Sequence, residues 1–224
     1  MSLLDAISKY FELELRDQSW TPKANISPSS KILAIVFDEK KGKILDTKVW
    51  GLVPYWSKEG KIKFNTINAR AENIETTPAY KMPFRKQRTL IIADGFYEWK
   101  TIEGKKVPFR FVLKSKELFA FAGVWDQWVS PDKTKSINSC SIITTRANQL
   151  VRPIHDRMPV ILHPDQFDLW LDPKNQDTEK LKSLLVPFPE EEMEVYPVSP
   201  LLNNPRNENP GLIEPIHPDP NKPE

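Results

Sequence analysis

Prolines are the feature of this sequence that most restricts its fold. The 224 residues include 21 prolines and only 7 glycines. Proline fixes φ and lacks a backbone N–H, so it interrupts helices and central strands. Such a density predicts short elements joined by rigid turns rather than long helices. The length allows one sizeable domain or at most two small ones.

Strand patterns dominate the rest of the chain. Apolar residues recur at helical spacing over 3–14, and two strands at 32–37 and 43–53 form an expected hairpin with Gly42 in its turn. We expect further strands at 89–93, 96–100, 109–114, 119–128, 139–145, 158–162 and 194–198, and short helices near 77, 164–171 and 178–185. Glu103-Gly104-Lys105 marks a second hairpin turn. We find no internal repeat and no central linker. The pattern therefore predicts an α+β fold, a single β-rich domain with a few short flanking helices.

The C-terminal end has a different composition. Residues 201–224 contain six prolines and show no periodicity, so they are expected either to wrap the domain in extended form or to be disordered. Residues 187–224 hold 2 Lys/Arg against 8 Asp/Glu. We therefore assign the domain to residues 1–203 and a Pro-rich acidic tail to 204–224.

Basic residues gather in the middle of the chain. The net charge is only +2, but residues 58–114 hold 13 Lys/Arg against 6 Asp/Glu, with aromatic residues between them. Such a segment suits a phosphate backbone with bases stacked beside it. The alternative is a solvated charged face above core aromatics, and charge alone does not decide between the two.

Several classes of protein are disfavoured. No apolar run approaches the roughly 18 residues of a membrane span, and the first 20 residues alternate charged with apolar positions, unlike a signal peptide. The single cysteine, Cys140, allows no intramolecular disulfide, which suits a reducing cytoplasm. No Cys/His cluster suggests zinc. We expect a cytoplasmic protein with no membrane association, no metal and no cofactor.

Three groups of polar residues are candidates for chemistry. Asn is disfavoured inside a strand, so Asn68, close to Arg70, suggests a specific hydrogen-bonding task, although it could simply bond a backbone group. Glu98 lies between two aromatic residues, which favours a raised pKa and acid–base work; the alternative is a solvent-facing strand carboxylate. His155 is either a catalyst or a structural hydrogen bonder. None of these residues alone indicates an enzyme.

Six motifs in a fixed order change this interpretation. They are W-G-L-V-P-x-W (50–56), N-A-R-x-E (68–72), A-D-G-F-Y-E-W (93–99), I-I-T-T-x-A-N (142–148), I-H-D-R-M-P-V-I-L (154–162) and V-S-P-x-x-N (198–203). As an ordered set they are highly specific, and the chain resembles the SOS response-associated peptidase (SRAP) family, also called abasic-site processing proteins. The resemblance extends from the first predicted helix to about Asn203, and it implies that the sheets are curved, barrel-like and mixed.

The resemblance implies a function in the DNA damage response. Family members bind single-stranded DNA in a basic groove and shield abasic sites by a covalent DNA–protein crosslink. Their nucleophile is an N-terminal cysteine exposed by removal of the initiator Met. Its α-amine and thiol condense with the aldehyde of the ring-opened sugar to give a thiazolidine. The expected partner is single-stranded DNA containing abasic sites, bound by a monomer.

The same resemblance assigns roles to individual residues. Asn68 would position the N-terminal residue and the sugar. Glu98 would act as acid and base for ring opening and for release of Met1, and His155 would handle protons at the sugar hydroxyl and in the Schiff-base steps. The residues expected to contact DNA, or to lie near it, are Trp50, Arg70, Trp99, Thr144 and Arg157. An aldehyde captured by an amine needs a proton donor and a base nearby, and Glu and His fill these roles near neutral pH.

The chain departs from the family pattern at its start. It begins Met1-Ser2-Leu3, directly at the predicted first helix, without the family's Cys-Gly-Arg-Phe, so Ser2 is not expected to replace the nucleophile. Either the N-terminus was lost through a mis-assigned or engineered start, which we favour, or this is a natural variant. Cys140 carries no α-amine and is expected to pack inside a strand. Two alternatives therefore remain: a cysteine-type peptidase limited to self-processing or acting on other proteins, and a non-catalytic single-stranded-DNA-binding module.

Overall fold

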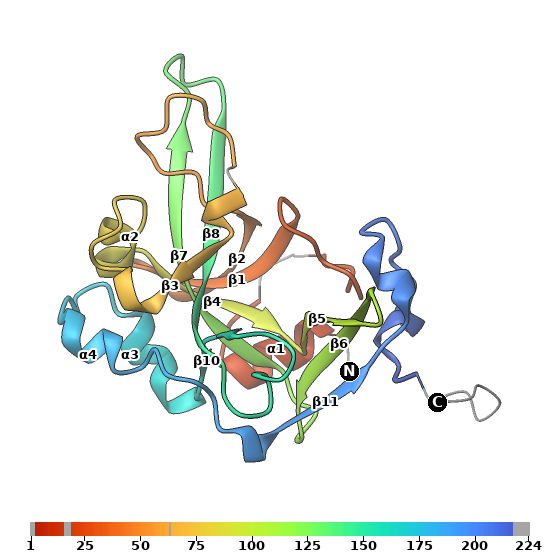
Figure 1. The fold of residues 1–224 in the computed structure, drawn as a ribbon. Helices are drawn as coiled ribbons and strands as arrows, with labels where there is room; N and C mark the ends of the chain where they lie inside the picture. Colours follow the sequence, from red (N-terminus) through yellow and green to blue (C-terminus); the bar gives the residue numbers. More distant parts are fainter. Residues whose placement is uncertain (1–2, 16–18, 63, 217–224) are drawn as a thin grey trace.

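A closed five-stranded barrel forms the centre of the molecule (Figure 1). The computed structural model describes residues 3–15, 19–62 and 64–216. The barrel strands are β1 (Lys31–Asp38), β2 (Gly42–Trp50), β4 (Arg88–Ala93), β7 (Phe119–Val129) and β8 (Ser136–Arg146). They run in the order β7-β4-β1-β2-β8, and β8 pairs again with β7 to close the ring. The β2–β8 pairing is parallel and the others are antiparallel, so the predicted barrel-like mixed sheet is confirmed.

Short strands extend the barrel beside β8. β3 (Asn68–Arg70) pairs with β8 in parallel, and β9 (Arg157–Pro159) pairs with β8 in the antiparallel sense. The strand predicted at 158–162 is divided, because β10 (Ile161–Leu162) pairs with β7 instead. Between them, the carbonyl of Val160 accepts a hydrogen bond from the N–H of Ala122. The pairing of β9 with β8 places the preceding segment, which contains His155, at the edge of β8.

A second sheet lies beside the barrel. β11 (Met193–Pro197), β6 (Lys105–Leu113) and β5 (Phe96–Ile102) form it in that order. The predicted hairpin turn between β5 and β6 is present, and both turn residues have positive φ, 49° at Glu103 and 75° at Gly104. That geometry matches the twist of the flanking strands. The sheet carries Glu98 on β5.

The helices are short, as the proline content predicts. They are α1 (Leu3–Phe11), α2 (Lys81–Lys86), α3 (Phe167–Leu171) and α4 (Thr178–Lys182), with 3-10 turns η1 (Phe64–Thr66), η2 (Ala71–Asn73), η3 (Pro164–Gln166), η4 (Glu190–Glu192), η5 (Pro200–Asn203) and η6 (Pro210–Ile213). α1 ends before the predicted residue 14, because Glu12 adopts a φ of 54°. Helices α2, α3 and α4 gather on one side of the barrel in Figure 1. The predicted few short flanking helices are therefore confirmed.

Two large apolar clusters hold these layers together. The first packs the helices against the barrel and contains the fully buried Trp170 and Phe84. The second fills the space between the barrel and the three-stranded sheet, around Phe111 and Phe119. β5 is therefore anchored through Phe96, whose ring stacks on Phe111 at 4.9 Å between centroids.

The C-terminal segment packs on the domain up to residue 216. Leu212 of η6 is buried, and Val198 forms an isolated β-bridge with Pro215. The side-chain amide of Asn25 donates hydrogen bonds to the carbonyls of Leu202 and Asn204. Residues beyond 203 thus contribute to the packed structure, and the domain boundary at 203 stays a prediction.

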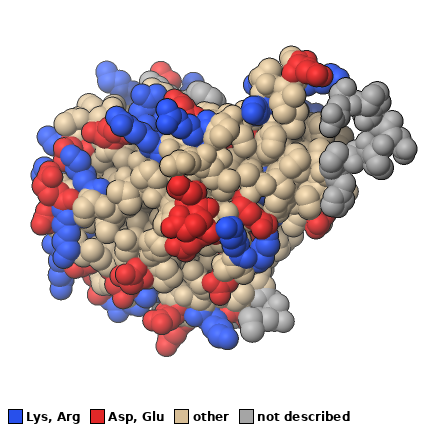
Figure 2. All heavy atoms as spheres, turned by 60° about the horizontal axis from the view of Figure 1, so that its bottom comes forward, with Lys and Arg blue, Asp and Glu red and all other residues tan. Residues whose placement is uncertain are grey.

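The surface charge is mixed on the face shown in Figure 2, which brings the lower end of Figure 1 forward. Lys/Arg and Asp/Glu lie interspersed there, with a group of acidic residues near the middle. Two members of the basic central segment, Arg88 and Arg110, are buried and hydrogen-bonded inside the protein. Their charges do not contribute to a phosphate-binding surface, so the charge count of residues 58–114 overstates the exposed positive charge.

Candidate functional site

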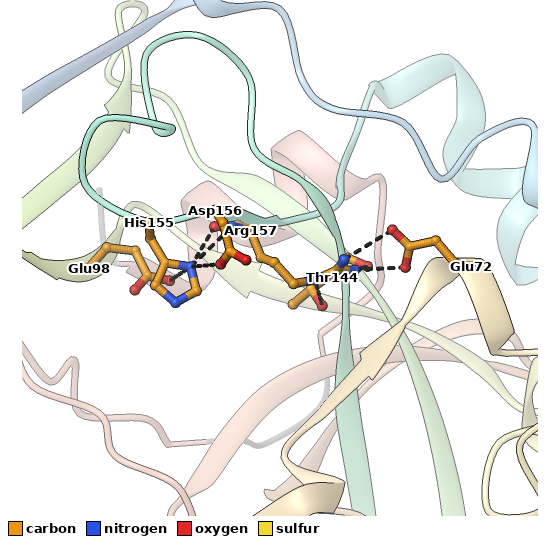
Figure 3. Close-up of polar contacts among 6 residues, drawn as sticks. All are labelled: Glu72, Glu98, Thr144, His155, Asp156 and Arg157. Carbon is orange, nitrogen blue, oxygen red and sulfur yellow. Dashed lines mark hydrogen bonds and ion pairs between the residues drawn. The ribbon is translucent and has the colours of Figure 1, made fainter.

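Glu98 and His155 lie together at one end of the candidate site (Figure 3). Oε1 of Glu98 is 4.0 Å from Nδ1 of His155, and the Glu98 side chain is only 23% exposed. Removal from water raises the pKa of Glu98 to about 7, against the opposing effect of His155 and with a further increase from Asp156. A carboxyl group with such a pKa exchanges protons readily near neutral pH. The sequence-based expectation of a raised pKa agrees with this environment.

The ring of His155 is oriented by the backbone that follows it. The N–H of Arg157 donates to Nδ1 at 3.1 Å, which fits a neutral ring with its proton on Nε2. When the ring is protonated, Nδ1–H faces the carbonyl of Arg157 at 3.1 Å and the carboxylate of Asp156 at 3.5 Å. Nδ1 therefore has a backbone donor and a backbone acceptor beside it.

Arg157 extends from His155 towards the other end of the site. Its guanidinium donates to both carboxylate oxygens of Glu72, at 3.0 and 2.9 Å. It also donates to the hydroxyl of Thr144 at 3.2 Å and to the carbonyl of Thr144 at 2.6 Å. The hydrogen bonds from Arg157 lower the pKa of Glu72. Figure 3 shows this continuous chain of polar contacts from Glu72 to Glu98.

The N-A-R-x-E motif lies alongside this chain of polar contacts. In β3 the side chains of Asn68 and Arg70 are exposed, whereas Ala69 between them is buried. Arg70 pairs in register with Thr144 of β8, one of the two residues that bind Arg157, and Asn68 pairs in register with Ile142. The Trp50 indole N–H donates to the carbonyl of Ile67 at 2.9 Å and fixes that ring beside the start of β3. The structure thus brings Asn68, Arg70, Thr144, Arg157 and Trp50 onto neighbouring elements.

Trp99 lies apart from these residues. Side chains alternate between the two faces of a strand, so Trp99 points to the face of β5 opposite Glu98. There its indole N–H donates to Oδ1 of Asn203 at 2.7 Å. A contact between Trp99 and DNA stays a prediction, and it would involve the outer face of the β5–β6 hairpin.

Cys140 is part of the core. It is completely buried, and burial raises the pKa of its thiol to about 12. A thiol in this environment is unreactive because the thiolate is the nucleophile. Met1 and Ser2, the first of which Glu98 was expected to help release and the second of which was not expected to replace the nucleophile, lie outside the described residues.

Sequence reasoning gave no role to three residues that the structure makes prominent. Glu72 closes the N-A-R-x-E motif, and its spacing from Arg70 was the available signal. Tyr55 and Trp56 are 61% and 54% exposed, unusual for large aromatic side chains. Their loop is fixed by Asp126, which accepts a 2.8 Å hydrogen bond from the N–H of Tyr55. Exposed aromatic rings on a fixed loop can stack on unpaired bases.

Within the described ranges, no three His, Cys, Asp or Glu side chains are grouped so that they could hold a metal ion. In the same part of the chain, no helix is long and apolar enough to cross a membrane.

Comparison with known proteins gives the family. The sequence profile of the SOS response associated peptidase (SRAP) family matches residues 2–205. This chain belongs to the SRAP family. Among relatives of this SRAP protein, the abasic site processing protein YoqW of Bacillus subtilis is 43% identical, over 95% of this chain and 96% of that protein. The abasic site processing protein HMCES of Gallus gallus is 31% identical, over 90% of this chain and 68% of its own length.

Solved structures agree with the SRAP fold described above. The crystal structure of a protein from Bacteroides thetaiotaomicron has a TM-score of 0.76 and 28% identity, over 84% of this chain and 82% of that one. A protein from Bordetella bronchiseptica has the same TM-score and 26% identity, over 87% of this chain and 95% of that one. The barrel with its flanking sheet is therefore shared with experimentally determined relatives.

Proposed function

We propose that this protein binds abasic sites in single-stranded DNA and that its site supports covalent capture of the abasic sugar. The observation that carries the proposal is the Glu98–His155 pair, a carboxyl group with a pKa near 7 beside an imidazole 4.0 Å away. Opening an abasic sugar ring and forming an imine both require proton transfers near neutral pH. The names of the relatives, abasic site processing proteins, point to the same substrate.

The covalent step consumes no oxidant or reductant. The α-amine of an N-terminal cysteine attacks C1 of the open-chain aldehyde, and the carbinolamine loses water to give an imine. The cysteine thiol then adds to the imine carbon and closes a five-membered thiazolidine. Glu98 would transfer the protons of ring opening, and His155 those at the sugar hydroxyl and the imine. The peptidase activity in the family name would correspond to release of the residue that precedes the cysteine.

The residues around the pair would hold the strand. Asn68 presents an exposed amide suited to the sugar and the N-terminal residue, and Arg70 presents an exposed guanidinium suited to a phosphate. Trp50 lies beside them. We propose that the protein acts as a monomer in the cytoplasm.

Noncovalent binding tests the partner. A fluorescently labelled single strand with one abasic site should bind more tightly than the intact strand and than a duplex, measured by anisotropy. Release of counterions should make the affinity fall steeply between about 50 and 200 mM salt. Equal or better binding to the duplex, or no salt dependence, would contradict the proposed interface.

Crosslinking tests the covalent step. The polypeptide as printed, starting Met1-Ser2-Leu3, should give no heat-stable adduct with the abasic strand on a denaturing gel. A version with Met-Cys-Gly-Arg-Phe and a short linker ahead of Leu3 should give one, and the matched version with Ser in place of that Cys should not. An adduct of the printed chain that survives Ser2→Ala together with Cys140→Ala would refute the nucleophile assignment. Binding by all versions without any adduct would instead favour a non-catalytic binding module.

A further inference from the structure

Glu72 lies at the far end of the polar chain from Glu98, where no catalytic role has been assigned. It belongs to η2, directly after β3, whereas Arg157 begins β9. Their two parallel hydrogen bonds, at 3.0 and 2.9 Å, join two segments that are distant in sequence. Such bidentate pairing fixes the plane as well as the position of a guanidinium.

A contribution to folding stability does not account for the Glu72–Arg157 ion pair. The Glu72 side chain is 45% exposed, and exposed ion pairs contribute little to folding. What the pair does fix is the direction of the Arg157 side chain, which also donates to the hydroxyl and carbonyl of Thr144. The guanidinium is thereby held against β8, away from the Glu98–His155 pair, as Figure 3 shows.

Without Glu72, Arg157 would have other anionic partners. Its own backbone N–H touches the ring of His155, and the groups facing that ring are the carboxylates of Glu98 and Asp156. A long, flexible cationic side chain that starts at this position can reach them. An opposite charge within about 4–6 Å favours the ionised form of a carboxyl group, so Glu98 would lose the protonated form that a general acid requires.

We propose that Glu72 is a positioning residue, which binds Arg157 so that its backbone N–H stays on Nδ1 of His155 and its cation stays away from Glu98. The competing explanation is that strand pairing alone fixes this region, because Arg157 also pairs in register with Arg146. The two explanations differ in what removal of the Glu72 carboxylate does to Glu98. The role rests on the proposed proton transfers at Glu98 and His155.

Titration of Glu98 provides the test. In the full chain with ¹³C-labelled glutamate carboxyls, the Glu98 signal is identified by its absence in Glu98→Gln. Glu72→Gln should lower the titration midpoint of Glu98 by about one unit or more. Glu72→Asp, which keeps the charge but is too short for both hydrogen bonds, should lower it less.

Two further variants separate Arg157 from a general charge effect. Glu75→Gln removes a nearby carboxylate that pairs with Lys182 at 2.9 Å, so it changes the net charge equally and should leave the midpoint in place. The double variant Glu72→Gln/Arg157→Gln should return the midpoint to the wild-type value, because the displaced cation is gone. An unchanged midpoint in Glu72→Gln, an equal shift in Glu75→Gln, or no recovery in the double variant would each overturn the proposal.

The ring of His155 gives a second readout. At about pH 8.5, where an ordinary imidazole is neutral, ¹⁵N spectra should show Nδ1 unprotonated in the wild type and a mixture of tautomers in Glu72→Gln. If Glu72→Gln showed the same single tautomer as the wild type, the result would contradict the positioning role. None of these measurements uses DNA. If they succeed while the wild type fails to prefer abasic DNA, the proposed function fails and the positioning role stands.

Discussion

The indole N–H of Trp99 donates a 2.7 Å hydrogen bond to Oδ1 of Asn203, and the amide of Asn203 donates in turn to the carbonyl of Lys106 at 3.1 Å. One side chain from η5 therefore binds both strands of the β5–β6 hairpin. These hydrogen bonds explain why the V-S-P-x-x-N motif ends in a polar residue. Through Asn203, the C-terminal segment holds β5, the strand that carries Glu98.

Asn203→Ala should accordingly weaken the fold. Each lost hydrogen bond costs roughly 0.5–1.5 kcal/mol, so we expect the free energy of unfolding in urea to fall by about 1–2 kcal/mol. Asn207→Ala is the matched control, since that amide makes one exposed hydrogen bond, to the carbonyl of Leu201. An equal loss of unfolding free energy in both variants would show that the contacts of Asn203 with the hairpin stabilise the fold no more than an ordinary exposed hydrogen bond.

Glu98→Gln should change how stability depends on pH. The pKa of Glu98 is raised from 4.5 to about 7, so its contribution to stability is complete below pH 4.5 and is lost as the pH rises through 7. By the cost of about 1.4 kcal/mol per pKa unit, the loss is on the order of 3 kcal/mol. The variant lacks the titrating group and should be more stable than the wild type at pH 8 but similar at pH 4.5.

Urea unfolding of both proteins at several pH values from 4 to 8 measures this difference. Glu103→Gln, in the exposed β5–β6 turn, is a control for the loss of one carboxylate on the same hairpin. Parallel stability curves for the wild type and Glu98→Gln would show that Glu98 titrates normally, and the acid–base assignment would lose its basis.

Local sequence patterns were sufficient to predict most strands, but they did not predict which strands and side chains contact each other. Alternation and turn residues were sufficient for the β5–β6 hairpin, because a hairpin is a local structure. The division of 158–162 into β9 and β10 could not be predicted, since it depends on which barrel strand is nearest after Pro159. Likewise the sequence identifies Arg157 as a cation, but only the fold reveals that Glu72 already binds it.

Arg88 shows that a count of charged residues in the sequence does not reveal which charges are exposed. It counted towards the basic central segment, yet its guanidinium is buried and donates only to backbone carbonyls among the described contacts. The acceptors are Phe84, Arg85, Trp170, Asp172 and Asn175. The residue therefore joins the ends of α2 and α3 instead of facing a phosphate.

Arg88→Met should consequently destabilise the protein without a specific effect on DNA. Each buried carbonyl left without a partner costs roughly 1–3 kcal/mol, so we expect a loss of at least about 3 kcal/mol in unfolding free energy. Arg85→Met, at an exposed position on the neighbouring helix α2, removes the same charge and should change stability by less than about 0.5 kcal/mol. Comparable stability in the two variants would contradict this role.

Trp56→Ala should weaken noncovalent binding of single-stranded DNA. The ring is exposed beside the equally exposed Tyr55, and stacking on a base contributes roughly 1–3 kcal/mol. Phe37→Ala, at an exposed aromatic on β1, is the control. Anisotropy titrations at constant salt should show a loss of about fivefold or more for Trp56 alone; equal effects at both positions would remove Trp56 from the interface.

The strongest test of the site separates chemistry from binding in the version that carries the N-terminal cysteine. A positioned acid or base contributes roughly 10²–10⁴ to a rate, so Glu98→Gln and His155→Ala should slow adduct formation by at least the lower figure. Noncovalent affinity should stay within about threefold, because neither residue supplies the positive charge that binds phosphate. If both residues were structural instead, the melting temperature and DNA affinity would fall together. Unchanged adduct rates in correctly folded variants would exclude Glu98 and His155 from catalysis, whatever their distance and the pKa of Glu98.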